Sequence, residues 1–403
     1  MKSILGKESL CPAKSVVSKR VKEITPSLVF AICEKANKMK ADGKDIVNFS
    51  VGEPDFGTPD YVIEAAGRAM NEGKTKYTET GGVLPLRKAV CEKLKSDSGL
   101  DYTPEQIVVS NGSKHSLFNT LSCLVDPGDE VIIFAPYWLT YPEVVKICGG
   151  VPVIVDNKKK LASAITSKTK VIIINSPNNP SGEVLSKAQI TEMAAVIEKH
   201  DVWVISDEIY EKLIYDMPPG SGVYSIAAHS KRLYERTIII NGLSKAYAMT
   251  GWRVGFSASS VEIAKAIRTF QSHTLQSVSA PNQYAAAEAL SNPKAGQTVA
   301  NMVKQFKERR DYMLERLGNM PHIKFTKPQG AFYVLIDVRK LGYCAKDVAD
   351  ELLEKSHLAV TPCEAFGLPG YIRLSYALSM NEIKKGLDRL EKFLTDSRVP
   401  CNA

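Results

Sequence analysis

Between residues 105 and 257 the chain repeats one pattern, in which a short apolar run is followed by a turn and a helical segment. The apolar runs are rich in Val and Ile, as strands are when both faces of a parallel sheet are covered by helices. Strands that alternate with helices predict an α/β domain. Seven strands are expected, at residues 107–109, 131–134, 151–155, 171–174, 202–205, 237–240 and 254–256.

The segments on either side of this repeat are richer in helix signals. Pro26-Ser27 opens one helix, a long segment spans 293–317, and a cap at Ser379 begins a final helix with one apolar stripe. Ser186 starts a capping box within the repeat. A chain of 403 residues with this layout is expected to form a second lobe from both ends. The predicted division is an N-terminal arm and part of the small domain (1–50), a large cofactor domain (51–294) and a small C-terminal domain (295–403).

Composition excludes several function classes. The formal net charge of +8 is modest, and the longest basic run, 158–160, is interpreted as a solvated loop, so a nucleic-acid partner is not expected. The first residues lack the apolar core of a signal peptide, and no run is long enough to span a membrane. Scattered cysteines without a paired motif indicate reduced thiols and neither a disulfide framework nor a metal site. The expected location is the cytoplasm. The cysteines are Cys11, Cys33, Cys91, Cys123, Cys148, Cys344, Cys363 and Cys401.

In open α/β sheets the ligand lies beyond the carboxyl ends of the strands, so the residues that follow each strand are candidates. Ser244 and Lys245 follow the strand at 237–240, and Arg253 comes eight residues later. A lysine after a strand is usually a surface residue. In a partly dry cleft near a second cation, however, its pKa falls and it can react with an aldehyde.

Asp207 and Tyr210 follow the strand at 202–205. An acid at this point is often only a helix cap. In the crevice, a buried carboxylate would instead keep a pyridine-type ring nitrogen protonated and make the ring an electron sink. The tyrosine could donate a hydrogen bond to a ring oxygen.

Two further turns could bind an anionic ligand. Gly112 and Ser113 lie between the strand at 107–109 and a helix, where free N–H groups can seat a phosphate, although any strand–Gly–helix turn looks similar. The turn at 175–182 is made rigid by two prolines, and its Asn179 would present a fixed amide to a ring oxygen or a carboxylate.

Together these segments resemble the fold-type I pyridoxal-phosphate aminotransferases, within the class-I aspartate aminotransferase subfamily that includes plant-type prephenate aminotransferases. The resemblance extends from about Ser18 to Phe393. It implies an α/β large domain with a mostly parallel seven-stranded sheet and a smaller α+β domain built from both chain ends. The signature blocks, in family order, are Gly52-Glu53-Pro54-Asp55-Phe56, Tyr77 before Gly81, Gly112-Ser113-Lys114, Pro136-Tyr137-Trp138, residues 176–182, Ser206 to Tyr210, Ser244-Lys245 and Arg373 to Tyr376.

The resemblance implies pyridoxal 5'-phosphate as cofactor, with Lys245 as the Schiff-base lysine that later moves the Cα proton. Asp207 is then the partner of the pyridine nitrogen, and Asn179 and Tyr210 bind the phenolic oxygen. Trp138 stacks on the ring, although from the sequence it could equally be a core aromatic. The phosphate is expected to be held by Gly112, Ser113, Ser244 and Arg253, and by Tyr77 of a neighbouring subunit in an obligate homodimer.

The resemblance also implies how the substrates are bound. Arg373 is expected to clamp the α-carboxylate, helped by Asn179, Gly52 and Trp138, because a planar arginine binds a carboxylate bidentately. Lys114 matches the lysine that binds a distal carboxylate, although a solvated lysine remains an alternative. The expected partners are therefore small amino acids and 2-oxo acids. The reaction is a ping-pong transamination between aspartate and 2-oxoglutarate that gives oxaloacetate and glutamate.

Three departures from the family pattern affect side-chain recognition. Val29 stands where relatives commonly carry a threonine, His115 where a glutamine is common, and the segment 155–161 is short. An aromatic, prephenate or broad-specificity aminotransferase, or a β-lyase on the same fold, therefore remains an alternative. A pyridoxal-phosphate-fold DNA-binding regulator is disfavoured, because only about fifty residues precede Gly52 and they match the family's own N-terminal arm.

Overall fold

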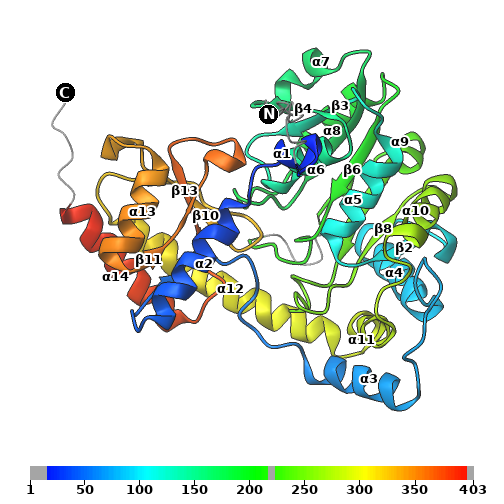
Figure 1. Ribbon diagram of the computed structural model, residues 1–403, viewed down its shortest axis with the longest axis horizontal. Coiled ribbons are helices and arrows are strands. Elements are labelled where there is room, and N and C mark those ends of the chain that lie inside the picture. The colour runs from blue at the N-terminus through cyan, green and yellow to red at the C-terminus, as the bar shows by residue number, and fades with distance from the viewer. Residues whose placement is uncertain (1–15, 217–222, 397–403) are drawn as a thin grey trace, which may run out of the picture.

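The computed structural model describes residues 16–216 and 223–396. Figure 1 shows two bodies, one built on a large sheet and one on a small sheet, with the long helix α12 (Ala295–Gly318) running from one to the other. The N-terminal helix α2 (Leu28–Ala41) and the C-terminal helix α14 (Met380–Asp396) both lie in the smaller body.

The larger body holds a seven-stranded sheet, as expected from the sequence. Only β8 runs antiparallel to its neighbours, and the other six strands share one direction. Side chains alternate between the two faces: Ile173 packs in the cluster beside α5 and α10, and Ile172 packs in the cluster beside α8. In spatial order the strands are β2 (Ile107–Ser110), β8 (Gly255–Ala258), β7 (Thr237–Gly242), β6 (Trp203–Asp207), β5 (Thr169–Asn175), β3 (Glu130–Phe134) and β4 (Val151–Val155).

One strand differs from the expectation that helices cover both faces. β4 is an edge strand, and its Val151 and Ile154 are 47% and 44% exposed. An apolar run of β-branched residues indicates a strand, but it does not distinguish the edge of a sheet from its centre.

Helices cover both faces of the large sheet. The capping box expected at Ser186 is formed at the start of α8. The Ser186 hydroxyl accepts a hydrogen bond from Gln189 N, and the Gln189 side chain accepts one from Ser186 N. The helices in this body are α3 (Asp60–Asn71), α4 (Leu84–Ser98), α5 (Ser113–Leu124), α6 (Thr140–Ile147), α7 (Leu161–Ala164), α8 (Lys187–Ile197), α9 (Lys231–Arg236), α10 (Val261–Thr274) and α11 (Ala280–Ser291). The remaining α-helices are α1 (Lys19–Lys22) and α13 (Ala345–Ser356).

Short 3₁₀ helices link several of these elements. The basic run expected to be a loop is one of them, and its Lys158 forms an ion pair with Glu183 at 2.7 Å. Lys159 and Lys160 are exposed, so the run is solvated as expected, although it forms a short helix and not a loop. The 3₁₀ helices are Pro104–Gln106, Lys158–Lys160, Ile226–Ala228, Arg339–Leu341 and Glu364–Phe366.

The smaller body is assembled from segments at both ends of the chain. β1 (Val47–Asn48) pairs in parallel with β11 (Leu358–Ala359). An antiparallel sheet of β12 (Thr361–Pro362), β13 (Tyr371–Ser375), β10 (Tyr333–Asp337) and β9 (Lys324–Phe325) lies beside this pair. The domain boundaries after residues 50 and 294 stay a prediction.

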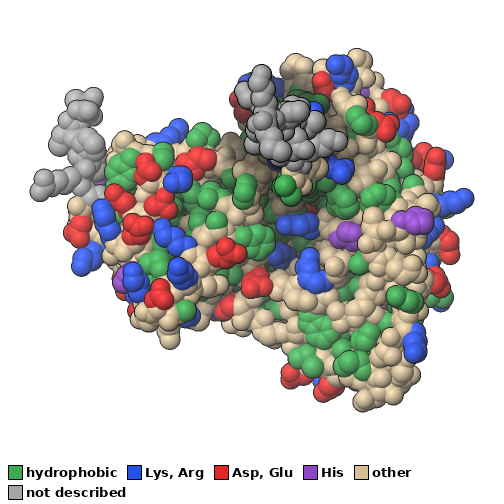
Figure 2. All heavy atoms as spheres, in the orientation of Figure 1, with side chains coloured by type: hydrophobic (Ala, Val, Ile, Leu, Met, Phe, Trp, Pro, Cys, Tyr) green, Lys and Arg blue, Asp and Glu red, His purple; other side chains and the backbone are tan. Residues whose placement is uncertain are grey.

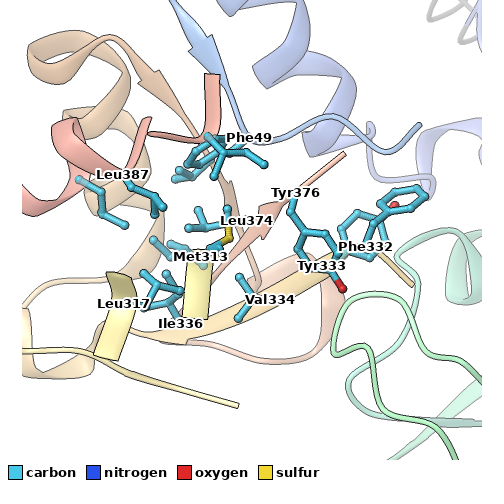
Figure 3. Packing of buried hydrophobic residues seen from close by; sticks show 14 of the residues in the cluster. Phe49, Met313, Leu317, Phe332, Tyr333, Val334, Ile336, Leu374, Tyr376 and Leu387 are labelled. Carbon is cyan, nitrogen blue, oxygen red and sulfur yellow. The ribbon is translucent and has the colours of Figure 1, made fainter. Parts of the chain in front are cut away.

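The core of the smaller body joins these segments. Phe49 from the N-terminal part packs with Met313, Leu374 and Leu387 from the C-terminal part (Figure 3). A Cβ atom on Gly386 would lie 2.3 Å from the Phe49 ring, so α14 reaches this ring only because residue 386 is glycine. The packing fixes the loop after Phe49, which leads into the site.

Candidate active site

The carboxyl ends of β2, β5, β6 and β7 lie along one edge of the large sheet. Asp207 and Asn175 are the last residues of β6 and β5, so these strands continue further than the sequence suggested. The backbone of Asp207 is held in place, because its carbonyl accepts from Asn175 Nδ2 at 3.0 Å and from Ser176 N at 3.3 Å. This edge faces the smaller body.

Lys245 reaches across the site to the loop after Phe49. Its Nζ atom donates to the Gly52 carbonyl at 2.5 Å and lies 5.9 Å and 5.8 Å from the ring centroids of Tyr210 and Phe332. Burial lowers the pKa of Lys245 to about 8. The Coulombic interactions with Glu53 and Asp207 oppose this shift, and those with Arg373 and Arg253 add to it. An amine in these surroundings is partly neutral near neutral pH, and a neutral amine attacks an aldehyde.

Asp207 is a buried carboxylate. Its Oδ2 accepts from the Tyr141 hydroxyl at 2.7 Å, and its Oδ1 accepts from Ile209 N at 3.3 Å. Burial raises the pKa of Asp207 to about 6, and the two hydrogen bonds and the interaction with Lys245 oppose the rise. A positively charged ligand atom beside this carboxylate would restore its ionised form. Tyr210 follows Asp207 by three residues, and its hydroxyl lies 3.1 Å from that of Tyr333.

A cationic cradle lies where the sequence predicted a phosphate seat. Gly112 caps α5 with φ at 84°, and the Ser113 hydroxyl donates to the Asn241 carbonyl at 2.9 Å. The Arg253 guanidinium lies against Gly112, since a Cβ atom there would be 2.3 Å from Arg253 Nη2. Within 16–216 and 223–396, no carboxylate forms an ion pair with Arg253. Ser244, also expected to bind the phosphate, is buried.

Arg373 is a buried charge in the interior of the site. It is 2% exposed, donates from Nη1 to Asn179 Oδ1 at 2.8 Å and from Nη2 to the Ser50 carbonyl at 3.1 Å. Its Nε has no hydrogen-bond partner in the described part of the chain, and no carboxylate there pairs with it. A buried guanidinium without a counter-charge is costly. This arrangement fits a ligand that brings its own carboxylate.

Lys114 lies in the first turn of α5, in the larger body. Its Nζ lies 5.1 Å from the Trp138 ring centroid and 5.8 Å from that of Phe30, which α2 contributes. Burial, and then the charge of Arg253, lower the pKa of Lys114. Figure 2 shows Lys and Arg side chains gathered in the hollow between the two bodies. Lys114 is nevertheless exposed to solvent, so the solvated lysine considered from the sequence stays an alternative.

Most of the candidates are brought together, and one is not. Tyr77 is 87% exposed and lies on the surface. Val29, which replaces a threonine of the family pattern, packs with Leu139 and Phe366 in an apolar cluster. His115 accepts from Asn111 N at 3.2 Å through Nδ1.

Two site tyrosines were missed from the sequence. Tyr333 has its hydroxyl 3.2 Å from where a Cβ atom on Gly52 would lie, and Tyr141 bonds Asp207. Tyr141 could have been found, because it lies three residues after Trp138 and thus one helical turn away. Tyr333 gave no such signal, since its strand was not among those expected.

The profile of the aminotransferase class I and II family matches residues 44–390. The chain belongs to this family. Its sequence is 41% identical over 395 residues to an aspartate aminotransferase of Bacillus sp. (strain YM-2), covering 94% of this chain and all of the relative. It is 39% identical over 391 residues to the aspartate/prephenate aminotransferase of Thermus thermophilus, covering 94% of this chain and 98% of the relative.

Solved structures agree with this membership. The aspartate aminotransferase from Thermus thermophilus with maleate superimposes with a TM-score of 0.90 at 39% identity, covering 94% of this chain and all of that one. The fold is therefore that of the fold-type I pyridoxal-phosphate aminotransferases, as the resemblance implied. None of the helices within the described residues has the length and apolarity needed to cross a bilayer.

Pyridoxal phosphate is the cofactor of this family, and the residues on this sheet edge fit it. The cradle at Gly112 and Arg253 suits a phosphate, which binds at helix N-termini and to arginine. Asp207 offers a buried carboxylate for a ring nitrogen, and Lys245 offers an amine for an aldehyde. The side-chain nitrogen of Asn241 beside the cradle has no partner in the described part of the chain.

Proposed function

We propose that this protein transfers the amino group of aspartate to 2-oxoglutarate in two half-reactions, giving oxaloacetate and glutamate. The observation that carries the proposal is Arg373, a buried guanidinium that pairs with no carboxylate in residues 16–216 and 223–396. An α-amino or 2-oxo acid supplies that carboxylate. The bound cofactor supplies an electron sink that stabilises the negative charge left when Cα loses its proton.

Arg373 and Asn179 orient the substrate. Two parallel N–H donors hold a carboxylate in one plane. Asn179 fixes the guanidinium, because its Oδ1 accepts a hydrogen bond from Arg373 Nη1 at 2.8 Å. We infer that this clamp would fix the direction of the Cα–H bond of a bound substrate. Gly52 and Trp138 line the same space in this proposal.

Lys245 has two roles in the proposal. Its amine would hold the cofactor, and the same amine, once free, would act as the base that takes the proton from Cα of the bound substrate. The lowered pKa of about 8 suits this role, because a base works best when its pKa lies near the working pH. Asp207 would pair with the ring nitrogen, and Asn179 and Tyr210 would donate to the ring oxygen.

Lys114 supports a dicarboxylic substrate. It is an exposed cation that forms no ion pair with a carboxylate in the described segments, and it belongs to α5 of the larger body, whereas Arg373 belongs to β13 of the smaller one. We propose that it binds the distal carboxylate of aspartate. Relatives named as aspartate aminotransferases support this assignment, as does a solved relative that contains the dicarboxylate maleate.

The rings of Trp138 and Phe30 favour a second candidate. They flank the Lys114 ammonium, and aromatic faces can also receive a ring-bearing substrate. An aromatic or prephenate activity on the same site is therefore the alternative, and one relative carries the aspartate/prephenate name.

The assembly belongs to the proposal as well. We infer a cytoplasmic homodimer in which Tyr77, 87% exposed in one subunit, reaches the phosphate of its neighbour together with Ser113, Ser244 and Arg253 of that neighbour. The proposed domains are residues 1–50, 51–294 and 295–403. Sedimentation of the holoenzyme tests the dimer.

The experiment that tests the function is a panel of amino donors with 2-oxoglutarate, in which kcat/KM is measured for aspartate, glutamate, prephenate-derived arogenate and phenylalanine. The proposal expects aspartate to be the best donor. A higher kcat/KM for phenylalanine would favour the alternative, and no transfer from any donor would contradict the function.

A further inference from the structure

Tyr141 is a buried tyrosine whose hydroxyl is directed at the site and not at the core. It is 2% exposed, and its hydroxyl donates to Asp207 Oδ2 at 2.7 Å across 66 residues of sequence. Its ring packs among the apolar side chains beside α5 and α6. The ring therefore has a structural role, and the hydroxyl serves one carboxylate.

Burial and neighbouring charge make Tyr141 a permanent donor. Burial first, and the adjacent Asp207 carboxylate second, raise the pKa of Tyr141 well above its ordinary value. The proton therefore stays on the phenol near neutral pH. A hydrogen bond from a neutral donor favours the charged form of a carboxylate.

Because Tyr141 is neutral, it does not cancel the negative charge of Asp207, which can still pair with a positively charged ligand atom. Apart from Tyr141, the titratable groups that act on Asp207 are Lys245, Tyr210 and Glu211. A lysine or arginine in the place of Tyr141 would satisfy the carboxylate by itself and compete with a protonated ring nitrogen. A phenol orients the carboxylate without neutralising it.

Tyr141 is tied to a second site residue through α6. Its N–H donates to the Trp138 carbonyl at 2.9 Å, and the two rings meet edge to face with centroids 5.4 Å apart. Tyr141 thus contacts both Asp207, which is proposed to pair with the ring nitrogen, and Trp138, which is proposed to stack on the ring. Both would shift if this turn of α6 moved.

We propose that Tyr141 is a positioning residue that holds Asp207, through Oδ2, in the orientation and the ionised form that a protonated ring nitrogen requires. The inference rests on the proposed function, because it needs a cofactor ring beside Asp207. It adds a role for a residue outside the set that contacts substrate.

The test uses holoenzyme carrying Tyr141→Phe, which keeps the ring and removes only the hydroxyl. The single-turnover rate with aspartate is expected to fall roughly tenfold or more, as the loss of a hydrogen bond to a charged group predicts. The acid limb of its pH profile is expected to move up by about one pH unit, because Asp207 then gains a proton more easily. KM for aspartate should hardly change.

Tyr215→Phe is the matched control. Tyr215 is also a buried tyrosine, and its hydroxyl donates to the Ala331 carbonyl at 2.5 Å, away from Asp207. This variant should lower the melting temperature by a similar amount and leave the pH profile in place. A wild-type rate and acid limb in Tyr141→Phe would overturn the inference.

A double-mutant cycle separates the inference from the function on which it rests. If Tyr141 acts through Asp207, Tyr141→Phe should cause no further loss in an Asp207→Ala background. The same fractional loss in both backgrounds would show that Tyr141 acts elsewhere and would overturn the inference. Wild-type turnover in Asp207→Ala alone would contradict the proposed function itself.

Discussion

The guanidinium of Arg373 lies 2.8 Å from the side-chain oxygen of Asn179, although the two residues are 194 positions apart. Asn179 follows β5 of the large sheet, and Arg373 belongs to β13 of the small one. This contact crosses between the two bodies at the point proposed for the substrate carboxylate. A substrate bound there touches both bodies at once.

Arg373→Lys tests the carboxylate clamp. Lysine keeps the charge but cannot donate two parallel hydrogen bonds, so kcat/KM for aspartate should fall roughly a hundredfold. Arg316→Lys is a suitable control, because Arg316 binds Asp388 and Glu391 at the surface of the smaller body. Equal kcat/KM values for the two variants would count against the clamp.

Lys114→Ala tests the distal carboxylate site. The loss of a charge-assisted bond should lower kcat/KM for aspartate by roughly ten- to a hundredfold, and it should barely affect phenylalanine. Lys187→Ala is the control, because Lys187 also lies over an aromatic ring, that of Tyr224 at 5.2 Å, but on another part of the surface. Equal losses on both donors would remove the basis for the aspartate assignment.

The pH dependence of cofactor loading tests the environment of Lys245. Only the unprotonated amine attacks an aldehyde, and burial lowers the pKa of Lys245 to about 8. The rate at which the apoenzyme links pyridoxal phosphate should therefore rise with pH and level off above about pH 8, and it should fall about tenfold per pH unit below that value. Stopped-flow absorbance measures this rate. A rate whose pH midpoint lies near the ordinary pKa of lysine would contradict the claim that burial lowers the pKa of Lys245.

Gly255→Ala tests how closely the phosphate cradle is packed. A Cβ atom on Gly255 would lie 2.3 Å from Ser113 N, so β8 or the start of α5 must move. We expect a loss of about 1–3 kcal/mol in the free energy of unfolding and weaker cofactor binding. Gly251→Ala is the control, because nothing lies within 4 Å of its added Cβ. Unchanged cofactor affinity in Gly255→Ala would show that the cradle tolerates the shift.

The sequence predicted the parts of the fold that depend on local patterns. The seven strands were found because β-branched apolar runs alternate with helical segments, and the residues beyond them led to Lys245, Asp207 and Asn179. The position of β4 at the sheet edge was not predicted, because strand order depends on long-range pairing.

The rest of the site could not be read from local signals. Arg373 was found through the family resemblance, whereas Tyr333 became visible only when tertiary packing placed its hydroxyl beside that of Tyr210. Phe30 was overlooked for the same reason, since α2 contacts Lys114 only after both ends of the chain meet.

The central claim is that one lysine, Lys245, carries the cofactor. The most direct measurement is reduction of the holoenzyme with borohydride, which makes the covalent link permanent, followed by digestion and mass spectrometry of the peptides. We predict that the cofactor mass will be found on the peptide that contains Lys245 and on no other. Cofactor attached to a different lysine, or no attached cofactor in an active enzyme, would contradict the claim.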